Sequence, residues 1–339
     1  MSKITNCLLK KDITCKPIWF MRQAGRYLPE FRKIRRNNKN FIKLCLNSRL
    51  SSELTLQPIK RYNLDAAIIF SDILIIPYAL GQDVSFSKYY GPKLGRFNFE
   101  SFTAKDNKEF LLNLRPVYDA IKITRKKLKQ DKSLISFVGA PWTLMVYMLG
   151  LKTTHNKLDI KKFNLYSNKF EEIIKTLSKY ICLHINEQHK SGSDIIQVFD
   201  SWAGLVPKKY IKNLCYQPNK EIVNFCKKKR IPVICFPKGL SDKYKNFVQS
   251  VKPNGINIDY DIKPKWARDN LRNVCIQGGL HPKYLLGNEK VLKKKVNEYL
   301  KVFSNVPYIF NLGHGMLPET KPSVVNKIVK RVGEFKNDK

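Results

Sequence analysis

The sequence lacks the patterns that would place it in a secreted or membrane class. Its eight cysteines include no C-x-x-C pair, residues 1–16 contain no apolar core typical of a secretory signal, and no stretch approaches about 18 consecutive apolar residues. We therefore expect reduced, mostly packed thiols, no disulfide framework, no membrane insertion and a cytoplasmic location.

Common cofactor and nucleophile motifs are also missing. The chain has no G-x-G-x-x-G after a strand, no Walker lysine, no H-E-x-x-H and no G-x-S-x-G. These absences exclude the dinucleotide, P-loop and zincin classes and disfavour a serine nucleophile. No pair of His, Cys or acidic residues has a spacing that compels a metal site. We expect a site that needs neither a metal nor an organic cofactor.

Acidic residues are scarce. The chain has 27 Asp and Glu but 63 Lys and Arg. The resulting formal charge of +36 ordinarily suggests a polyanionic partner. The excess is mostly lysine scattered through helix-like stretches such as 122–132 and 290–301, together with much Asn and Ile. This pattern is typical of compositional drift. We expect non-specific polyanion binding in vitro but no specific nucleic-acid partner.

What the chain does contain is a repeat of short apolar runs, each followed by a turn and a stretch with helical spacing, such as 163–189 and 291–303. Hydrophobic residues make up 43% of the 339 positions, so a large core is available. The repeat predicts an α/β protein with a single-domain (β/α)8 TIM barrel over residues 17–335, preceded by a loose N-terminal extension, residues 1–16. The eight predicted strands cover residues 17–21, 65–70, 134–139, 194–200, 232–236, 255–259, 274–278 and 308–312.

Catalytic groups of such a barrel follow its strands. After the first run, Arg22 and Arg26 flank the small residues Ala24 and Gly25, which leave room for a ligand beside two permanently charged guanidiniums. The pattern predicts an anion-binding turn. The alternative is a solvated helix face with i,i+4 spacing.

Three further strand ends carry polar side chains. Asp72 follows the second run between apolar neighbours, and it is either a ligand-binding carboxylate or a helix cap or ion-pair partner. Tyr147 follows the third run and is either a site phenol or a core aromatic. Ser201 follows the fourth run and is either a site hydroxyl or a helix cap.

Of five histidines, His314 is the strongest candidate, because glycines flank it after the last strand and allow a ligand to approach the backbone. His281, after Gly278-Gly279-Leu280, is the second choice. The others lie in helical or basic stretches.

Five segments resemble the uroporphyrinogen decarboxylase family, and they occur in that family's order. They are PIWFMRQAGRYLPEFR at 17–32, FSDIL at 70–74, FVGAPWTL at 137–144 with Tyr147-Met148, FDSWAG at 199–204 and NLGHG at 311–315. The resemblance spans roughly residues 17–332. Two segments depart from the usual pattern: the glycine run after Met148 is shortened, and Gly279 and His281 replace the Asn and Asp that are common there.

The resemblance implies a cofactor-independent carboxy-lyase of porphyrin and haem biosynthesis, a homodimeric barrel that converts uroporphyrinogen III to coproporphyrinogen III by removing four acetate carboxyl groups as CO2. It also implies catalytic roles for Asp72, Arg22, Arg26 and Tyr147. In the family pattern Asp72 accepts the pyrrole N–H groups and balances a cationic ring. Substrate binding would involve those four residues together with Gln23, Ala24, Gly25, Ser201 and His314.

Two other classes remain. Related barrel methyltransferases bind zinc and act on corrinoid-linked methyl groups, but they need a His/Cys ligand set that this sequence does not offer. A non-catalytic tetrapyrrole or nucleic-acid binder would bind polyanions tightly at physiological salt without turnover.

Overall fold

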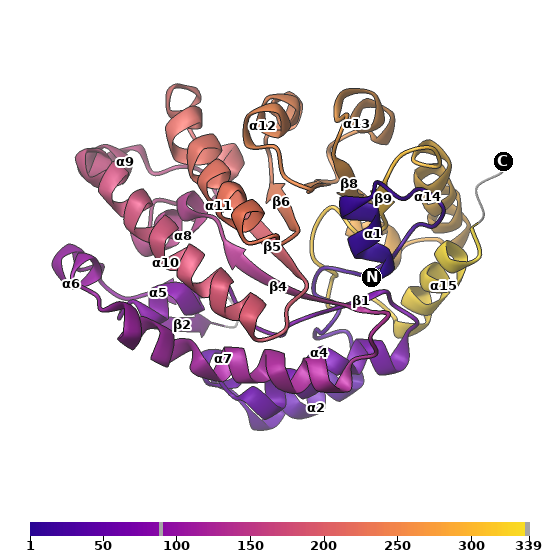
Figure 1. Ribbon diagram of the computed structural model, residues 1–339, viewed down its shortest axis with the longest axis horizontal. Coiled ribbons are helices and arrows are strands. Elements are labelled where there is room, and N and C mark those ends of the chain that lie inside the picture. Colours follow the sequence, from indigo (N-terminus) through magenta and orange to yellow (C-terminus); the bar gives the residue numbers. More distant parts are fainter. Residues whose placement is uncertain (88–90, 336–339) are drawn as a thin grey trace.

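The computed structural model describes residues 1–87 and 91–335. Its centre is a sheet of seven strands in which every pair of neighbours is parallel. Figure 1 shows this sheet surrounded by helices. In spatial order the strands are β1 (Ala66–Ile68), β4 (Ser133–Gly139), β5 (Ile195–Asp200), β6 (Val233–Pro237), β7 (Gly255–Ile258), β8 (Cys275–Gly278) and β9 (Tyr308–Ile309).

Residues 17–21 occupy the gap between β9 and β1, where the predicted first strand should lie. Ile18 forms a parallel bridge with Phe310, and its carbonyl accepts the Asp65 N–H at 2.9 Å. The Ile18 N–H bonds the Asp65 carboxylate at 2.8 Å. The predicted barrel fold is confirmed, with one difference: a side chain replaces a main-chain partner here, so the first run makes a single bridge instead of a regular strand.

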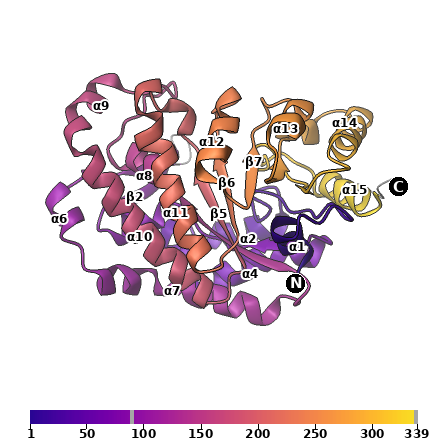
Figure 2. The ribbon, with the colours of Figure 1, turned by 45° about the horizontal axis from the view of Figure 1, so that its top comes forward.

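Apart from the N-terminal helix, the helices lie outside the sheet (Figures 1 and 2). The longest, α7 (Asn107–Lys127) and α10 (Phe170–Lys190), are 21 residues each, and α7 is capped by Asp106, whose carboxylate accepts the N–H groups of Lys108 and Glu109. The helices are α2 (Pro29–Asn37), α3 (Phe41–Cys45), α4 (Ser48–Arg61), α5 (Ile75–Ala79), α6 (Phe99–Thr103), α7 (Asn107–Lys127), α8 (Pro141–Met148), α9 (Ile160–Tyr166), α10 (Phe170–Lys190), α11 (Gln217–Lys228), α12 (Tyr244–Val251), α13 (Pro264–Asn270), α14 (Glu289–Val302) and α15 (Pro322–Gly333).

Two features differ from the predicted pattern between strands. The helix predicted over 163–189 is divided into α9 and α10 by a 3-10 turn, Ser167–Lys169. An antiparallel hairpin of β2 (Val84–Ser87) and β3 (Gly91–Leu94), which the sequence reading missed, lies outside the parallel sheet.

The N-terminal extension was expected to be loose, and that expectation was wrong. Residues Lys3–Leu9 form helix α1, and its Ile4 and Leu8 side chains are fully buried in a cluster with inward-facing strand residues such as Ile135 and Ile309. Gly255 of β7 makes room for this helix, because a Cβ there would lie 2.7 Å from a Leu8 methyl group. Helix α1 therefore packs on the barrel and contributes to its core. The boundary at residue 17 stays a prediction.

A buried polar ladder crosses the barrel interior. The Trp19 indole N–H donates to Gln277 Oε1 at 2.9 Å, and the Gln277 amide donates to Gln197 at 3.1 Å and to Asn257 at 2.7 Å. Unpaired amides at these fully buried positions would cost free energy, so the ladder fixes the relative register of four segments of the barrel wall.

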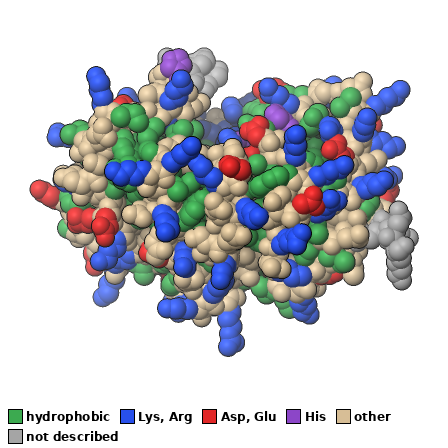
Figure 3. Space-filling model, turned by 90° about the horizontal axis from the view of Figure 1, so that it is seen from above, with side chains coloured by type: hydrophobic (Ala, Val, Ile, Leu, Met, Phe, Trp, Pro, Cys, Tyr) green, Lys and Arg blue, Asp and Glu red, His purple; other side chains and the backbone are tan. Residues whose placement is uncertain are grey.

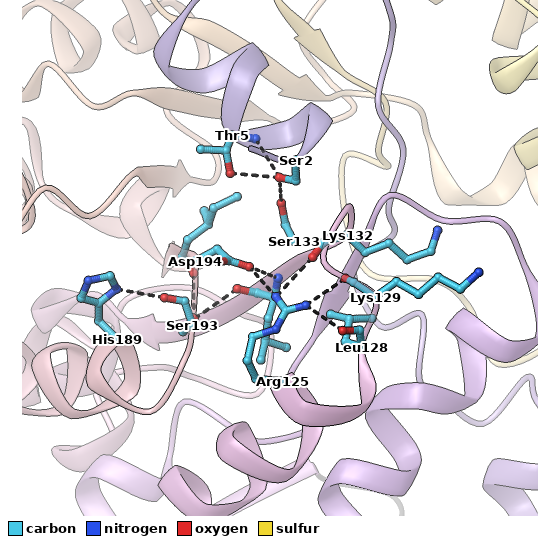
Figure 4. A network of polar contacts seen from close by, with 12 residues as sticks. Ser2, Thr5, Arg125, Leu128, Lys129, Lys132, Ser133, His189, Ser193 and Asp194 are labelled. Atoms are coloured by element: carbon cyan, nitrogen blue, oxygen red, sulfur yellow. Dashed lines mark hydrogen bonds and ion pairs between the residues drawn. The ribbon is translucent and has the colours of Figure 1, made fainter.

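A second polar network, shown in Figure 4, joins helix α7 to the start of two strands. The Arg125 guanidinium bonds the Asp194 carboxylate at 2.9 Å and the carbonyls of Leu128 and Lys129, each at 2.9 Å. Asp194 also accepts the Leu134 N–H at 2.7 Å. These bonds hold the N-terminal ends of β4 and β5 together, at the end of the barrel away from the predicted site.

The positive charge is dispersed. In the face drawn in Figure 3, Lys and Arg side chains are scattered over most of the surface, and a hollow along the upper edge contains some of them. Within the described residues, no helix is long and apolar enough to cross a membrane. All eight cysteines are free thiols, and six of them are buried.

Candidate active site

The predicted site residues follow different strands but all lie toward the carboxyl end of the barrel. Asp72 follows β1, Tyr147 lies in α8 after β4, Ser201 directly follows β5, and His314 follows β9. Arg22 interacts electrostatically with Asp72, Tyr147 and His314, and Trp202, which adjoins Ser201, packs against Tyr147. The strand ends therefore meet around one mouth.

The Arg22 segment is a turn and not a helix, so the helix-face alternative is wrong; α2 begins only at Pro29. Arg22 itself has a φ of 60°, in the left-handed region that non-glycine residues rarely adopt. Neighbouring bonds hold it there: the Met21 N–H donates to Asn311 Oδ1 and the Gln23 N–H to the Phe20 carbonyl, both at 3.0 Å.

The Gln23 side chain faces the barrel wall. Its oxygen accepts the Phe20 N–H, and its amide donates to the Ala66 carbonyl, each at 3.0 Å. A substrate contact from Gln23 would therefore have to come from its main chain. Gly25 is required by the tightness of the same turn, because a Cβ there would lie 2.8 Å from the Arg22 carbonyl oxygen.

The Arg22 side chain lies along Gly315. A Cβ at 315 would be 2.4 Å from Arg22 Cδ and 2.7 Å from Nε, so only glycine leaves space for the guanidinium in this position. Arg22 retains exposed surface, yet the surrounding protein lowers its pKa, and the nearby charge of Arg26 adds to this effect while Asp72 opposes it. The Arg26 side chain is exposed at the same turn.

Asp72 is a carboxylate with spare hydrogen-bonding capacity. Its Oδ1 accepts the Leu74 N–H at 2.8 Å, but α5 begins at Ile75 without a side-chain cap, and no described residue forms an ion pair with Asp72. Asp72 thus closes a turn just before α5 through one oxygen, and no described residue donates a hydrogen bond to its other oxygen. Burial raises the pKa of Asp72 to about 6, against the lowering effects of the Leu74 N–H and Arg22.

This pKa predicts a pH-dependent stability difference between the native chain and an Asp72→Asn variant. Because the folded-state pKa lies above the ordinary value of 3.8, the native state holds this proton more tightly than the unfolded state does. The stability that this group contributes is present below pH about 4 and is lost as the pH rises through about 6.

We therefore expect Asp72→Asn to match the native chain at pH about 4 and to be the more stable of the two at pH about 7.5, as measured by thermal unfolding across that range. The neutral amide has no charge to desolvate. A constant difference across the range would show that the Asp72 carboxyl is not desolvated.

Tyr147 is the half-buried member of α8, whose other side chains are buried. Its ring meets the Trp202 ring edge to face with centroids 6.0 Å apart, and burial raises the pKa of its hydroxyl. Ser201 is half-buried beside Trp202. Trp202 is anchored through its main chain, because its carbonyl accepts the Trp142 indole N–H at 2.7 Å and its N–H donates to Thr143 Oγ1 at 3.1 Å.

His314 is a neutral imidazole. Burial lowers its pKa to about 4, and the positive charges of Lys238 and Arg22 add to the effect. Its Nδ1 accepts the Gly315 N–H at 2.6 Å, so the proton of the neutral ring is on Nε2, which can donate to an anion. Gly313 lets this loop pass the chain at Tyr260, whose nitrogen would be 2.3 Å from a Cβ at 313.

Sequence reasoning missed two groups near this mouth. They are Lys238 after β6 and Tyr260 after β7; the Lys238 ammonium lies 6.0 Å from the centroid of the Tyr260 ring. The available signal was position, since Lys238 and Tyr260 follow their strands by one and two residues. His281, the second-choice histidine, packs against Tyr260 with the rings tilted by 38° and their centroids 4.1 Å apart.

The described residues contain no group of three or more His, Cys, Asp or Glu side chains that could hold a metal ion. Independence of metals and cofactors stays a prediction.

Comparison with known proteins identifies the family of the chain that carries this site. The family model described as uroporphyrinogen decarboxylase matches residues 1–335. The chain belongs to the uroporphyrinogen decarboxylase family. The predicted resemblance is thereby confirmed, and with it the enzyme class, a decarboxylase of porphyrin biosynthesis.

Relatives with the name uroporphyrinogen decarboxylase match along nearly their full length. The one from Rickettsia bellii is 42% identical over 328 residues, which cover 94% of this chain and 95% of the relative. The one from Mesorhizobium japonicum is 38% identical over 319 residues, 93% of each chain.

A solved methyltransferase structure from Methanosarcina mazei matches with a TM-score of 0.76, covering 97% of each chain at 15% identity. At that identity the likeness supports the barrel fold alone, and it gives no support to the methyltransferase alternative.

Proposed function

We propose that the chain converts uroporphyrinogen III to coproporphyrinogen III, and that Asp72 stands at the centre of the reaction. The observation that carries this proposal is a desolvated carboxylate with a free acceptor site, placed beside the cationic Arg22 at the mouth of a barrel of this family. The substrate is a macrocycle with inward-pointing pyrrole N–H donors and carboxylates on its rim, which matches an acidic centre with a basic surround.

In this proposal Asp72 accepts the pyrrole N–H groups and balances the positive charge that forms when a ring carbon is protonated. Protonation turns the pyrrole into an electron sink, so the C–C bond to the acetate carboxylate can break and release CO2. The electron pair returns to the ring as the added proton leaves, and the methylene carbon takes up a proton to become a methyl group. Each of the four steps therefore consumes one proton net and releases one CO2.

The basic groups would bind the carboxylates on the rim of the substrate macrocycle. Arg22 and Arg26 present forked donors to substrate carboxylates, with Ala24 and Gly25 keeping the turn small, and His314 offers its Nε2–H as a neutral donor. Tyr147 and Ser201 would orient the reacting pyrrole from the β4 and β5 side. Arginine is a weak acid with a pKa above about 12, so we assign the two arginines to binding and charge stabilisation.

The proposal includes a homodimer, a cytoplasmic location and no requirement for a cofactor. The support is the family match together with the lack, in the described part of the chain, of a helix suited to crossing a membrane.

The test is an anaerobic assay of metal-free purified protein with uroporphyrinogen III, in which the products are separated by carboxylate number. We expect successive loss of four carboxyl groups and accumulation of coproporphyrinogen III. Activity that appears only when stoichiometric zinc is supplied would argue against the proposal. Tight polyanion binding with no turnover would favour the non-catalytic alternative.

A further inference from the structure

Lys238 directly follows β6, and its main chain is clamped to the neighbouring strand end. Its N–H donates to the Asp200 carbonyl at 3.1 Å, and its own carbonyl accepts the Gly204 N–H at 3.0 Å. Both partners belong to the segment that carries Ser201 and Trp202. The root of the Lys238 side chain is therefore fixed relative to the β5 wall of the mouth.

The Lys238 ammonium has charged neighbours of the same sign. The charge of Arg22 repels it, and its own charge disfavours protonation of His314, which places it in the same electrostatic environment as the two predicted site residues. The side chain is half-buried, and burial lowers its pKa. Its ammonium lies 6.0 Å from the centroid of the Tyr260 ring, and at this distance the ring attracts a cation only weakly.

Two acidic residues lie near enough to attract Lys238, but no ion pair with it forms within the described part of the chain. Asp259 is committed elsewhere: its Oδ2 accepts the Gly239 N–H at 2.8 Å and the Tyr244 hydroxyl at 3.2 Å, and its Oδ1 accepts the Asp261 N–H at 3.2 Å. A half-buried ammonium that forms no ion pair and is repelled by the charge of Arg22 is unfavourable unless an anion binds there.

We propose that Lys238 binds a carboxylate of the tetrapyrrole substrate and is a substrate-positioning residue on the β6 side of the mouth. Like Arg22 and His314, it follows a segment of the barrel wall, so the three residues bring donors to the same end of the barrel. This inference rests on the proposed function for the identity of the anion, and it assigns to β6 a role in the site that no sequence motif suggested.

The test compares Lys238→Met, which removes the charge but keeps the length, with Lys238→Arg, which keeps the charge. Lys227→Met, an exposed lysine near the end of α11, is the matched control. We expect Lys238→Met to raise KM for uroporphyrinogen III about tenfold with kcat within about threefold, and to make KM less dependent on salt. Lys238→Arg should restore most of the affinity. An unchanged KM in Lys238→Met, or an arginine variant as weak as the methionine variant, would overturn the proposal.

Binding of uroporphyrin III, followed by fluorescence, separates this inference from the proposed function. A native chain that binds this unreactive porphyrin but does not decarboxylate would refute the proposed function, and the Lys238 contact would still be read from the Kd. We expect the Kd to rise about tenfold in Lys238→Met and to stay unchanged in Lys227→Met. Equal Kd values in all three proteins would refute the contact.

A third measurement tests where the ammonium points. Because the charge of Lys238 contributes to the low pKa of His314, its removal should raise that pKa, which the NMR titration of the His314 ring protons measures. A purely structural lysine facing away from the mouth would leave the titration unchanged, and that result would also count against the proposal.

Discussion

Replacing Asp72 by Asn is expected to lower kcat about a thousandfold or more and to leave the fold intact. The amide keeps the size of the carboxylate and can still accept the Leu74 N–H that Asp72 accepts at 2.8 Å. It cannot carry the negative charge that balances a protonated pyrrole ring, and charge stabilisation of this kind in a desolvated site is commonly worth about 10²–10³ per group or more. Anaerobic single-turnover and steady-state assays with uroporphyrinogen III measure the loss.

Asp131→Asn is the matched control, because it makes the same chemical change at an exposed turn before β4. This control should keep native activity, and Asp72→Asn should unfold at or above the native temperature at neutral pH. Turnover by Asp72→Asn within about tenfold of the native chain would refute the electrostatic role. A lowered unfolding temperature would instead assign the loss to damaged structure.

Much of the barrel was predictable because strand ends in a parallel barrel are marked locally. Seven of the apolar runs coincide with strands, and the polar residues predicted after them lie at one mouth. The unpredicted parts depend on what each segment packs against. Ile4 and Leu8 lie one helical turn apart, a spacing that allows a helix, but the cavity that buries them is lined by residues from strands far away in the sequence.

The site residues also divide into those that the local sequence marks and those whose position depends on distant parts of the chain. Arg22 and His314 stood out because small residues surround them, and the structure gives the physical reason in the close approach of Gly315 to Arg22. Lys238 did not stand out, since it is one basic residue among 63. Gln23 belongs to the same motif as Arg22, yet its side chain turns toward Phe20 and Ala66, and nothing local in the sequence reveals that direction.

Replacing the two glycines that flank His314 by alanine should have different effects, one on activity and the other on stability. At 315 the new Cβ would lie 2.4 Å from Arg22 Cδ, an atom of a flexible side chain that can move away. At 313 it would lie 2.3 Å from the Tyr260 nitrogen and 2.8 Å from the Asp259 carbonyl carbon, both of them backbone atoms that are held by the adjacent strand. The first substitution therefore tests the position of Arg22, and the second tests the packing of the barrel rim.

We expect Gly315→Ala to fold with nearly native stability and to lose about a hundredfold in kcat/KM, because a displacement of about 1 Å in a positioning group has an effect of that size. Gly313→Ala should lose about 3 kcal/mol or more in the free energy of unfolding, because the added Cβ would clash with backbone atoms. Gly333→Ala, where no atom lies within 4 Å of the added Cβ, is the control for both. Denaturant unfolding and the anaerobic assay together separate the outcomes. A Gly315→Ala variant with native kcat/KM would mean that the guanidinium of Arg22 does not need the position that this glycine gives it.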